Sequence, residues 1–395
     1  MVHWKKNLIF VWLSQFLSFA GFSFAMPFIP FYIQRLGITD PSQLSIWVAQ
    51  FTAAGYLSFT VFSPIWGFLA DIHGRRIMLL RANFANAILT PLMAYAPGVG
   101  WLVAIRLVMG AFSGTNTAAQ TLISGNTPYE KRGFALGTLS SAIYSGAMAG
   151  AFLGGIIVDT FGYRIAFILC GCMFLAAGGL AAIGVKEDFV PHMTFQEKMK
   201  EFEIRLPRFG PVWYILLLVL IMGYARQFDI PFLPMMVEKV NGAKDAASWT
   251  GLLTSASAIA GVLSGIVLGW LADKISAPKV ALCSALLAGV LMIPHGLANS
   301  IGMLFTARFA MVFFAGGLDP VFQIWLAKCT PDKDRGLFFG WAGSAKTLGW
   351  VLCSVSSGAV AMFAGIRAVY FVAAVVYILL IPAIFCAVRK LPPHK

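Results

Sequence analysis

Charged residues are scarce in this chain of 395 residues. Lys, Arg, Asp and Glu together make up 11% of it, whereas about a quarter of the residues of soluble domains are charged. Hydrophobic residues make up 59%, and apolar runs of about 20 residues, long enough to cross a ~30 Å hydrocarbon core as helices, recur along the chain. The scarcity of charge excludes an ordinary soluble domain and predicts a polytopic membrane protein.

The residue types that build metal, redox and nucleotide sites are also few or poorly arranged. The six cysteines and five histidines do not have the spacing of a zinc or redox site. No glycine-rich loop ends in Lys followed by Ser or Thr, and no nucleophile stands beside a positioned base. We predict no enzymatic activity, no metal and no cofactor, and we expect His73 and His295 to be surface residues.

Apolar runs and the breaks between them predict an all-α fold with twelve transmembrane helices. Six lie on each side of the longest hydrophilic segment, which indicates an N-terminal six-helix bundle over 1–185, a cytoplasmic linker over 186–211 and a C-terminal six-helix bundle over 212–395. The predicted spans are 8–33, 45–70, 77–96, 100–124, 134–160, 163–185, 212–237, 248–272, 279–297, 301–326, 337–363 and 366–388.

The positions of Lys and Arg indicate the topology. Most of the 29 basic residues, such as Lys5, Arg76 and Lys131, fall in segments that are cytoplasmic if the N-terminus is inside, and such a bias in short loops sets orientation. We therefore expect both termini to be cytoplasmic. Anionic headgroups beside these segments account for the net charge of +13 without nucleic acid.

Two halves of the chain resemble each other. "GFLADIHGRR" from residue 67 matches "GWLADKISAP" from residue 269, and the prolines at 27 and 30 recur at 231 and 234. Such a repeat predicts a duplicated six-helix unit with a substrate site between the halves near mid-membrane and alternating access by rocking. The prolines free backbone carbonyls and bend the first and seventh helices, which makes a plausible hinge.

Six charged residues lie within the predicted spans, namely Arg106, Arg226, Asp229, Arg308, Asp319 and Lys346. A charge at the centre of a membrane helix costs at least ~2.5–3.5 kcal/mol, so by default it faces the protein interior and has a function. At ~1.5 Å per residue, Asp319 and Lys346 lie at equal depth in the inner half. Asp229 and Arg308 match in the outer half, with Arg226 one turn away on the same helix face.

These pairs predict a proton switch. An aspartate held beside a basic group stays ionised, whereas one whose partner moves away into an apolar cavity favours the protonated form. The alternative is a static salt bridge in each case. Arg106 has no acidic residue at similar depth in its half of the sequence, so it either attracts an anion or bonds backbone carbonyls. The excess of basic over acidic residues in the spans favours an anionic or zwitterionic amphiphile, such as a phosphonate, a carboxylate antibiotic, a bile-salt-like acid or a siderophore.

Aromatic residues beside the proline pairs and Asp319 are candidates for the substrate cavity. They are Phe28, Phe31, Tyr32, Phe228, Phe232, Trp325 and Trp341.

Three segments resemble a known family. "GFLADIHGRRIMLL" resembles the loop between helices 2 and 3 of the major facilitator superfamily, "RLVMGAFSG" resembles its helix-4 arginine motif, and "MPFIPFYIQRLG" is similar to helix 1 of the twelve-helix drug:proton antiporters. The likeness covers essentially the whole chain and is nearest to bacterial fosfomycin, deoxycholate and fluoroquinolone exporters.

The resemblance implies roles for several of these residues. Gly67, Asp71, Gly74 and Arg75 would form a conformational latch in which Asp71 engages the loop around Arg132 and the start of the eleventh helix. Gly67 would allow close helix packing and Gly74 a tight turn. In the alternative, Arg75 and Arg76 only mark topology. Relatives carry the proton on acidic residues of helices 7 and 10, where Asp229 and Asp319 stand.

The family's glycine-rich fifth helix reads "SGAMAGAFLGG" here. Gly146, Gly150, Gly154 and Gly155 leave one face without side chains, so this helix can approach a neighbour closely. Ala151 stands where the family has a proline, which puts the kink and its association with export in doubt.

We therefore expect a proton-coupled exporter of small amphiphilic drugs in the bacterial cytoplasmic membrane. The proton gradient would supply the energy, and the partners would be the substrate, protons and lipid, with the chain acting as a monomer. The alternatives are a dedicated exporter of one metabolite or siderophore, uptake by symport, and a scaffold or sensor that does not transport.

Overall fold

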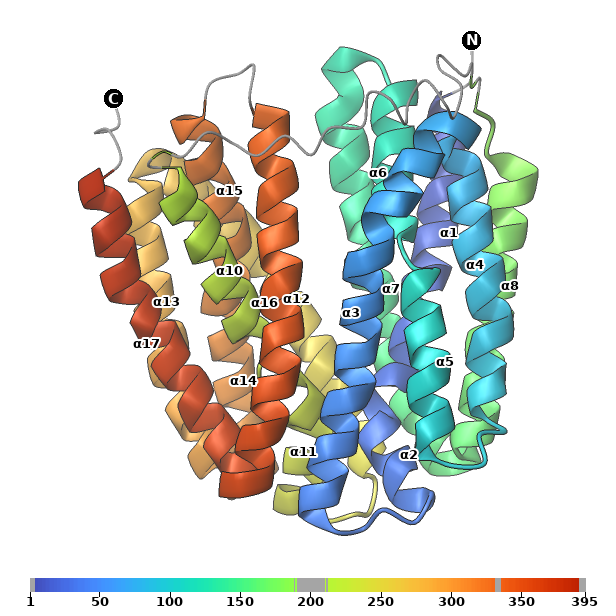
Figure 1. The fold of residues 1–395 in the computed structure, drawn as a ribbon, viewed down its shortest axis with the longest axis vertical. Helices are drawn as coiled ribbons and strands as arrows, with labels where there is room; N and C mark the ends of the chain where they lie inside the picture. The colour runs from blue at the N-terminus through green and yellow to red at the C-terminus, as the bar shows by residue number, and fades with distance from the viewer. Residues whose placement is uncertain (1–3, 188, 190–209, 211, 331–334, 391–395) are drawn as a thin grey trace. The chain divides into compact units, whose positions relative to one another are not determined.

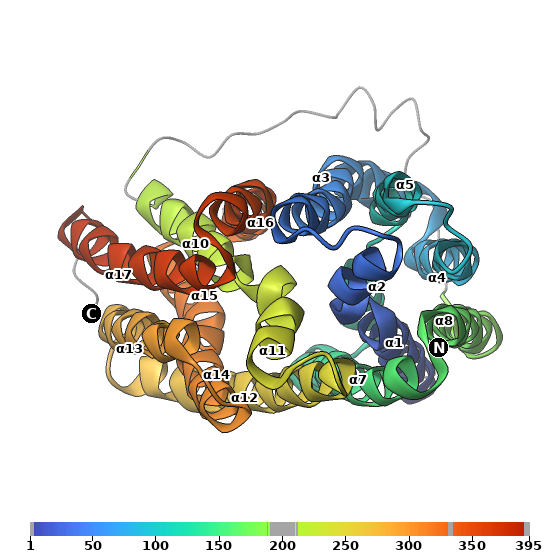
Figure 2. The same ribbon diagram turned by 90° about the horizontal axis from the view of Figure 1, so that it is seen from below.

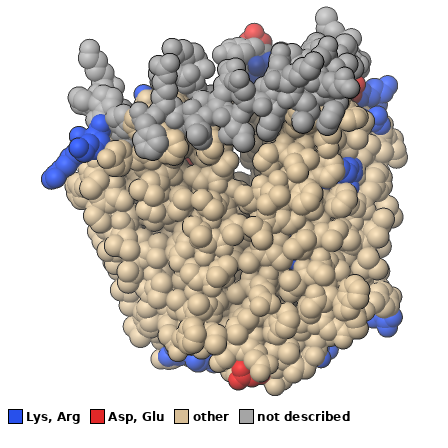
Figure 3. Space-filling view, viewed as in Figure 1, with Lys and Arg blue, Asp and Glu red and all other residues tan. Residues whose placement is uncertain are grey.

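The computed structural model describes residues 4–187, 189, 210, 212–330 and 335–390, and all regular structure in these ranges is helical. Ten helices in the described ranges are long and apolar enough to cross a membrane. The two other predicted spans are α4, whose Arg76, Arg81, Asn83 and Asn86 lower its hydropathy, and the fourth, which is split into two short helices. On the face drawn in Figure 3, uncharged side chains form most of the surface that is not grey.

In the N-terminal half, α1 lies between α7 and α8 (Figures 1 and 2). The elements of this half are α1 (Trp4–Ala25), η1 (Met26–Phe28), α2 (Ile29–Arg35), α3 (Pro41–His73), α4 (Arg75–Met93), α5 (Val99–Ala111), α6 (Thr115–Asn126), η2 (Tyr129–Lys131), α7 (Arg132–Phe161) and α8 (Tyr163–Gly184).

In the C-terminal half, α13 packs along α17 and α14, and α10 packs along α16 (Figure 1). The elements are α10 (Trp213–Gln227), η3 (Ile230–Phe232), α11 (Leu233–Asn241), α12 (Ala246–Lys274), α13 (Ala277–Leu297), α14 (Ile301–Gly316), α15 (Leu318–Cys329), α16 (Arg335–Ala364) and α17 (Ile366–Lys390).

The breaks in the long helices repeat in the two halves. Pro27 begins the interruption of the first span at η1, and Pro231 does the same in the seventh at η3. Proline lacks an N–H and clashes with the preceding turn, so the chain tightens into a 3₁₀ turn at both places. The fourth span breaks between α5 and α6 near Gly114, and the tenth breaks between α14 and α15 at Gly317.

The glycines of α7 bring this helix against α1. A Cβ on Gly146, Gly150 or Gly154 would overlap the backbone carbonyls of Phe16, Ala20 and Phe24 respectively. Gly155 faces Ala247 in the same way. Ala151, in the position of the family's proline, is fully buried and α7 runs through it as a continuous helix.

By its internal contacts the chain divides into two compact units. One contains Met1–Tyr32, Ala54–Ile204 and Ala247–Ser255, and the other contains Ile33–Ala53, Arg205–Ala246 and Ala256–Lys395. Each unit holds most of one predicted bundle and one short segment from the other half. The predicted linker over 186–211 lies mainly outside the described residues.

Candidate functional site

The most deeply buried charges of the C-terminal half are Asp229 and Arg308. Asp229 follows the end of α10 and precedes η3, where the proline of the repeat prevents the helix from continuing. The Arg308 guanidinium of α14 donates to the Asp229 carboxylate, and the side chains of Arg308 and Asp229 are 6% and 1% exposed. A buried ion pair of this kind is maintained because either charge alone would be costly at this depth.

His295 lies in the same buried region, although its position near a helix end had predicted a surface residue. It is fully buried and stacks on Tyr370 of α17, with ring centroids 5.4 Å apart. His295 Nε2 and the Tyr370 hydroxyl have no hydrogen-bond partner among the described residues. The surface prediction was wrong because position along α13 gives depth but not the face, and this face packs against α17 and α14.

A second group of charges surrounds Asp319 in the first turn of α15. Lys346 Nζ of α16 lies 3.1 Å from Asp319 Oδ2, and Arg226 Nη1 of α10 lies 3.8 Å from the same oxygen. Gln323 Nε2 donates to Asp319 Oδ1 at 3.2 Å. The side chains of Asp319, Lys346 and Arg226 are 23%, 25% and 36% exposed, so this carboxylate is far more accessible than Asp229.

The predicted grouping of Arg226 with Asp229 was wrong, because the ion pair that Arg226 makes is with Asp319. The prediction assumed one continuous helix, in which residues three apart share a face. However, α10 ends at Gln227, so Asp229 lies beyond the helix and the rule for residues on one helix face does not apply to it. The predicted pairs of equal depth, Asp319 with Lys346 and Asp229 with Arg308, are both present.

Two glycines set the distance between the helices that hold Asp319's cationic partners. A Cβ on Gly223 of α10 would lie 2.7 Å from the Lys346 carbonyl oxygen, and one on Gly349 of α16 would overlap the Leu220 carbonyl. The absence of side chains there lets α10 and α16 approach closely and places Arg226 and Lys346 on one carboxylate. Sequence analysis did not identify these glycines, although they stand three residues from each cation.

Arg106 of α5 is positioned by a glycine of α3. Its guanidinium occupies the space beside Gly55, where a Cβ would lie 2.5 Å from Arg106 Nε, and its Cζ lies 5.1 Å from the centre of the Phe22 ring. Gly110 of α5 packs against the Gly55 carbonyl. Arg106 is 8% exposed, so its charge is held in a largely dehydrated environment.

The aromatic candidates divide into two groups. Phe28, Phe228, Phe232 and Trp325 are fully buried, and Phe31 is 6% exposed. The Tyr32 hydroxyl donates to the Met93 carbonyl at 3.1 Å, and its ring packs 5.1 Å from that of Phe167. Tyr32 therefore takes part in the packing of α2 against α8, while Trp341 stays partly exposed on α16.

These features agree with the chain's similarity to known proteins. Residues 11–225 and 215–395 match the model of the Major Facilitator Superfamily. The chain belongs to the Major Facilitator Superfamily. This membrane transporter shares 30% identity over 373 residues with the "Multi-drug resistance efflux pump PmrA homolog" of Lactococcus lactis subsp. lactis (strain IL1403). The aligned region covers 93% of this chain and 91% of the relative. It shares 32% identity over 376 residues with the "Multidrug resistance protein MdtG" of Salmonella schwarzengrund (strain CVM19633), at 94% and 93% coverage.

Solved structures show the same fold. A mutant of the nucleoside transporter NupG superposes with a TM-score of 0.79 at 11% sequence identity, covering 96% of this chain and 99% of that one. A bacterial homologue of the human lysosomal transporter Spinster gives 0.74 at 15% identity, with 97% and 96% coverage. The expected twelve-helix major facilitator fold is confirmed, and the transporter is not an enzyme.

The loop shared with the superfamily joins α3 to α4 in the transporter. Gly74 has a φ of 88°, a conformation that glycine adopts without strain, and Asp71 Oδ1 lies 3.0 Å from Arg75 Nη2. The Glu187 carboxylate accepts from the backbone amides of Arg75 and Arg76 at 3.1 and 2.7 Å. It therefore caps the start of α4, where the first amides have no partner within the helix. Glu187 was not among the predicted residues.

The other two residues of the predicted latch, Gly67 and Arg132, lie in different surroundings from each other. A Cβ on Gly67 would meet no described atom within 4 Å, so the predicted close helix packing at Gly67 stays a prediction. Gly67 borders a cavity, which leaves open space on this side of α3. Arg132 Nε donates to the Thr127 carbonyl at 3.2 Å, at the start of α7.

Proposed function

We propose that this transporter exports small anionic or zwitterionic amphiphiles in exchange for protons, by alternating access between its two halves. The names of the relatives at 30–32% identity support drug efflux as the class of transport. We further propose that it resides in the bacterial cytoplasmic membrane with both termini inside, in keeping with the distribution of its basic residues.

The observation that carries this proposal is the position of Asp319. This carboxylate is shared by two cations, Lys346 and Arg226, and about a quarter of its side chain is accessible. While both cations are in place, Asp319 stays ionised; separation of α10 or α16 from α15 would favour protonation. Movement of these helices would thereby couple proton binding to the conformational cycle.

The buried Asp229–Arg308 pair has a different part in this proposal. Since it is almost inaccessible, proton exchange there would require the outer half of the C-terminal bundle to open. We assign it to holding η3 against α14, which keeps the break in the seventh helix at a fixed position. The latch of Asp71, Gly74, Arg75 and Arg132 would act on the same cycle from the α3–α4 loop.

Arg106 is the proposed selector of substrate charge. A guanidinium held in a dehydrated site offers a planar fork of donors to a carboxylate, phosphonate or phosphate group. Its place against Gly55 and over the ring of Phe22 supports recognition of an anionic group next to an apolar one. A dedicated exporter of one acidic metabolite would use the same arrangement and is the second candidate.

Transport in liposomes tests the proposal directly. The purified protein is reconstituted, and uptake of fosfomycin, a fluoroquinolone and deoxycholate is measured with the lumen either more acidic or more alkaline than the bath. Proton antiport predicts accumulation only with an acidic lumen, abolished by a protonophore. Accumulation with an alkaline lumen would establish symport instead. If a compound stabilises the protein but its transport does not depend on the proton gradient, coupling to protons would be contradicted.

A further inference from the structure

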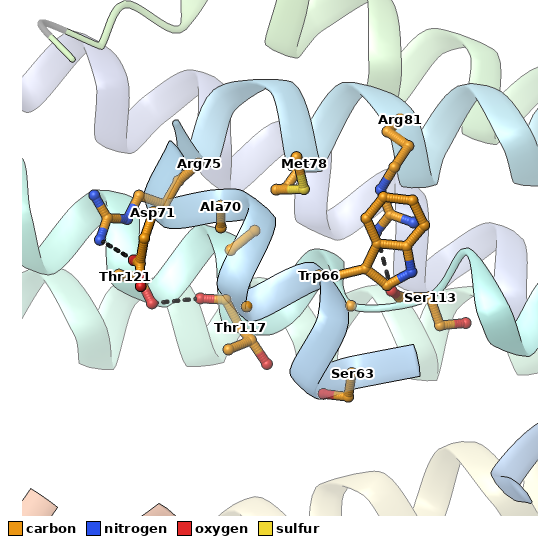
Figure 4. Close-up of a pocket in the computed structure, with 13 residues that line it drawn as sticks. Ser63, Trp66, Ala70, Asp71, Arg75, Met78, Arg81, Ser113, Thr117 and Thr121 are labelled. Atoms are coloured by element: carbon orange, nitrogen blue, oxygen red, sulfur yellow. Dashed lines mark hydrogen bonds and ion pairs between the residues drawn. The ribbon is translucent and has the colours of Figure 1, made fainter. Parts of the chain in front are cut away.

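A cavity of about 260 Å³ lies between α3, α4 and α6; the Asp71–Arg75 pair lines it, and the ion pairs of Asp229 and Asp319 do not. Figure 4 shows Arg81 and Trp66 together at one end of it and the Asp71–Arg75 pair at the other, with Thr117 between them on α6. Pockets for drug-sized ligands usually have ~300–1,000 Å³. This one therefore suits a ligand no larger than a lipid headgroup.

Arg81 is incompletely satisfied in this cavity. Its Nη2 donates to the Ser113 carbonyl at 3.2 Å, and its Cζ lies 3.5 Å from the centre of the Trp66 ring, so the guanidinium plane is fixed. Its Nε and Nη1 are buried and have no hydrogen-bond partner within the described part of the chain. Buried donors in folded proteins are nearly always paired, and two charged donors without an acceptor indicate a missing one.

The electrostatics of the cavity favour an anion as that acceptor. The Asp71 charge is balanced by Arg75 at 3.0 Å, which leaves Arg81 as the excess charge. In addition, Gly114, with a φ of 119°, breaks the fourth span so that α6 begins at Thr115 beside the cavity. The first amides of a helix carry partial positive charge, and interrupted membrane helices present them to anions.

We propose that this cavity binds an oxyanion, the phosphate or carboxylate of a headgroup-sized ligand, with the guanidinium of Arg81 as its principal cationic group. Arg81 lies six residues after the start of α4, which places it ~9 Å along the helix, near the boundary between headgroups and hydrocarbon. The oxyanion can therefore come from a phospholipid headgroup or from a free anion in the adjacent aqueous phase. The site borders the latch residues Asp71 and Arg75, but its binding of an anion does not rest on the proposed transport cycle.

Thermal unfolding of the delipidated full-length protein in a maltoside detergent tests the proposal and separates the two sources. One arm adds sodium phosphate against sodium chloride of equal ionic strength; the other adds phosphatidylglycerol against an uncharged galactolipid with the same acyl chains. A ligand that binds only the folded protein raises the unfolding midpoint. We expect a rise in at least one arm, and the arm that responds identifies the source.

The variants connect this rise to the cavity. Arg81→Gln should abolish it, and Arg81→Lys should weaken the apparent Kd about tenfold because lysine lacks the planar fork. Arg164→Gln, which removes a guanidinium stacked 4.5 Å from Tyr95 at another helix end, should leave it unchanged. Should Arg81→Gln not fold, Gly67→Leu serves instead, since its side chain would fill the cavity while Arg81 remains. A wild type that responds in neither arm, or a cavity variant that responds like the wild type, would overturn the proposal.

Discussion

At the scale of single residues, the two aspartates of the C-terminal half have different environments. Asp229 is buried with one arginine, and Asp319 is partly exposed between two cations. Burial limits Asp229 to a structural role as long as the bundle stays closed, whereas Asp319 can exchange protons with water. This difference in exposure is the basis for assigning proton coupling to Asp319.

We predict that Asp229→Asn strongly destabilises the protein. Removing one partner of a buried ion pair leaves the other charge uncompensated and costs ~3–5 kcal/mol. The midpoint of thermal unfolding in detergent should fall accordingly. Adding Arg308→Met to Asp229→Asn should restore a large part of the loss, because the buried charge is then gone.

Asp40→Asn is a matched control, since Asp40 is exposed and its carboxylate accepts from the Gln43 amide at 2.8 Å. It should lower the midpoint slightly. Equal stability of Asp229→Asn and the wild type, or no recovery in the double variant, would show that the pair does not hold this part of the bundle.

At the scale of helices, glycines fix the closest approaches. We predict that Gly150→Ala destabilises the protein by ~1–3 kcal/mol, because the added Cβ would overlap the Ala20 carbonyl of α1 and force the helices apart. Gly137→Ala in the same helix is the control, since a Cβ there meets no described atom within 4 Å. It should be neutral or stabilising by ~0.5–1 kcal/mol. Thermal unfolding of the two variants side by side would reveal whether close packing of α7 on α1 matters; indistinguishable midpoints would argue that it does not.

A second prediction at this scale concerns coupling. Gly223→Ala should push α16 away from α10, because its Cβ would lie 2.7 Å from the Lys346 carbonyl oxygen. We expect substrate-driven proton flux per transported substrate to fall severalfold in liposomes. Gly340→Ala, in open space on α16, should retain the wild-type ratio. Unchanged coupling in Gly223→Ala would mean that the spacing of these helices does not set the environment of Asp319.

The helices also show what the sequence could and could not predict. Apolar runs located all twelve spans, and Pro27 and Pro231 marked the breaks at η1 and η3, because proline acts locally on its own turn. The break at Gly114 was not predicted, since a glycine within an apolar run is compatible with a continuous helix. Depth along a helix follows from counting residues, so the paired depths were correct. The side of the helix on which a residue lies does not follow from such a count. For this reason the partner of Arg226 and the burial of His295 were predicted wrongly.

At the scale of the whole molecule, the chain is a multi-pass transporter whose two halves carry the same helix breaks but different charges. The N-terminal half holds the buried Arg106 and the Arg81 cavity, and the C-terminal half holds both aspartates of the membrane interior. This asymmetry agrees with a division of labour in which one half selects the substrate's charge and the other carries the proton.

We predict that Arg106→Gln lowers transport of fosfomycin and deoxycholate by about tenfold or more, the loss expected for one charge-assisted recognition contact. Direct uptake measurements would check this, and unaltered transport of both compounds would remove Arg106 from substrate recognition.

Substrate-induced proton flux in liposomes containing the wild type or Asp319→Asn tests the central claim most directly. Asp40→Asn serves as the control for loss of a carboxylate, and elution profiles establish that each variant is folded. The account predicts that Asp319→Asn binds substrate but no longer moves protons in response to it, while Asp40→Asn behaves like the wild type. Persistent proton flux in a folded Asp319→Asn would contradict it and would make the group of Asp319, Lys346 and Arg226 a structural contact.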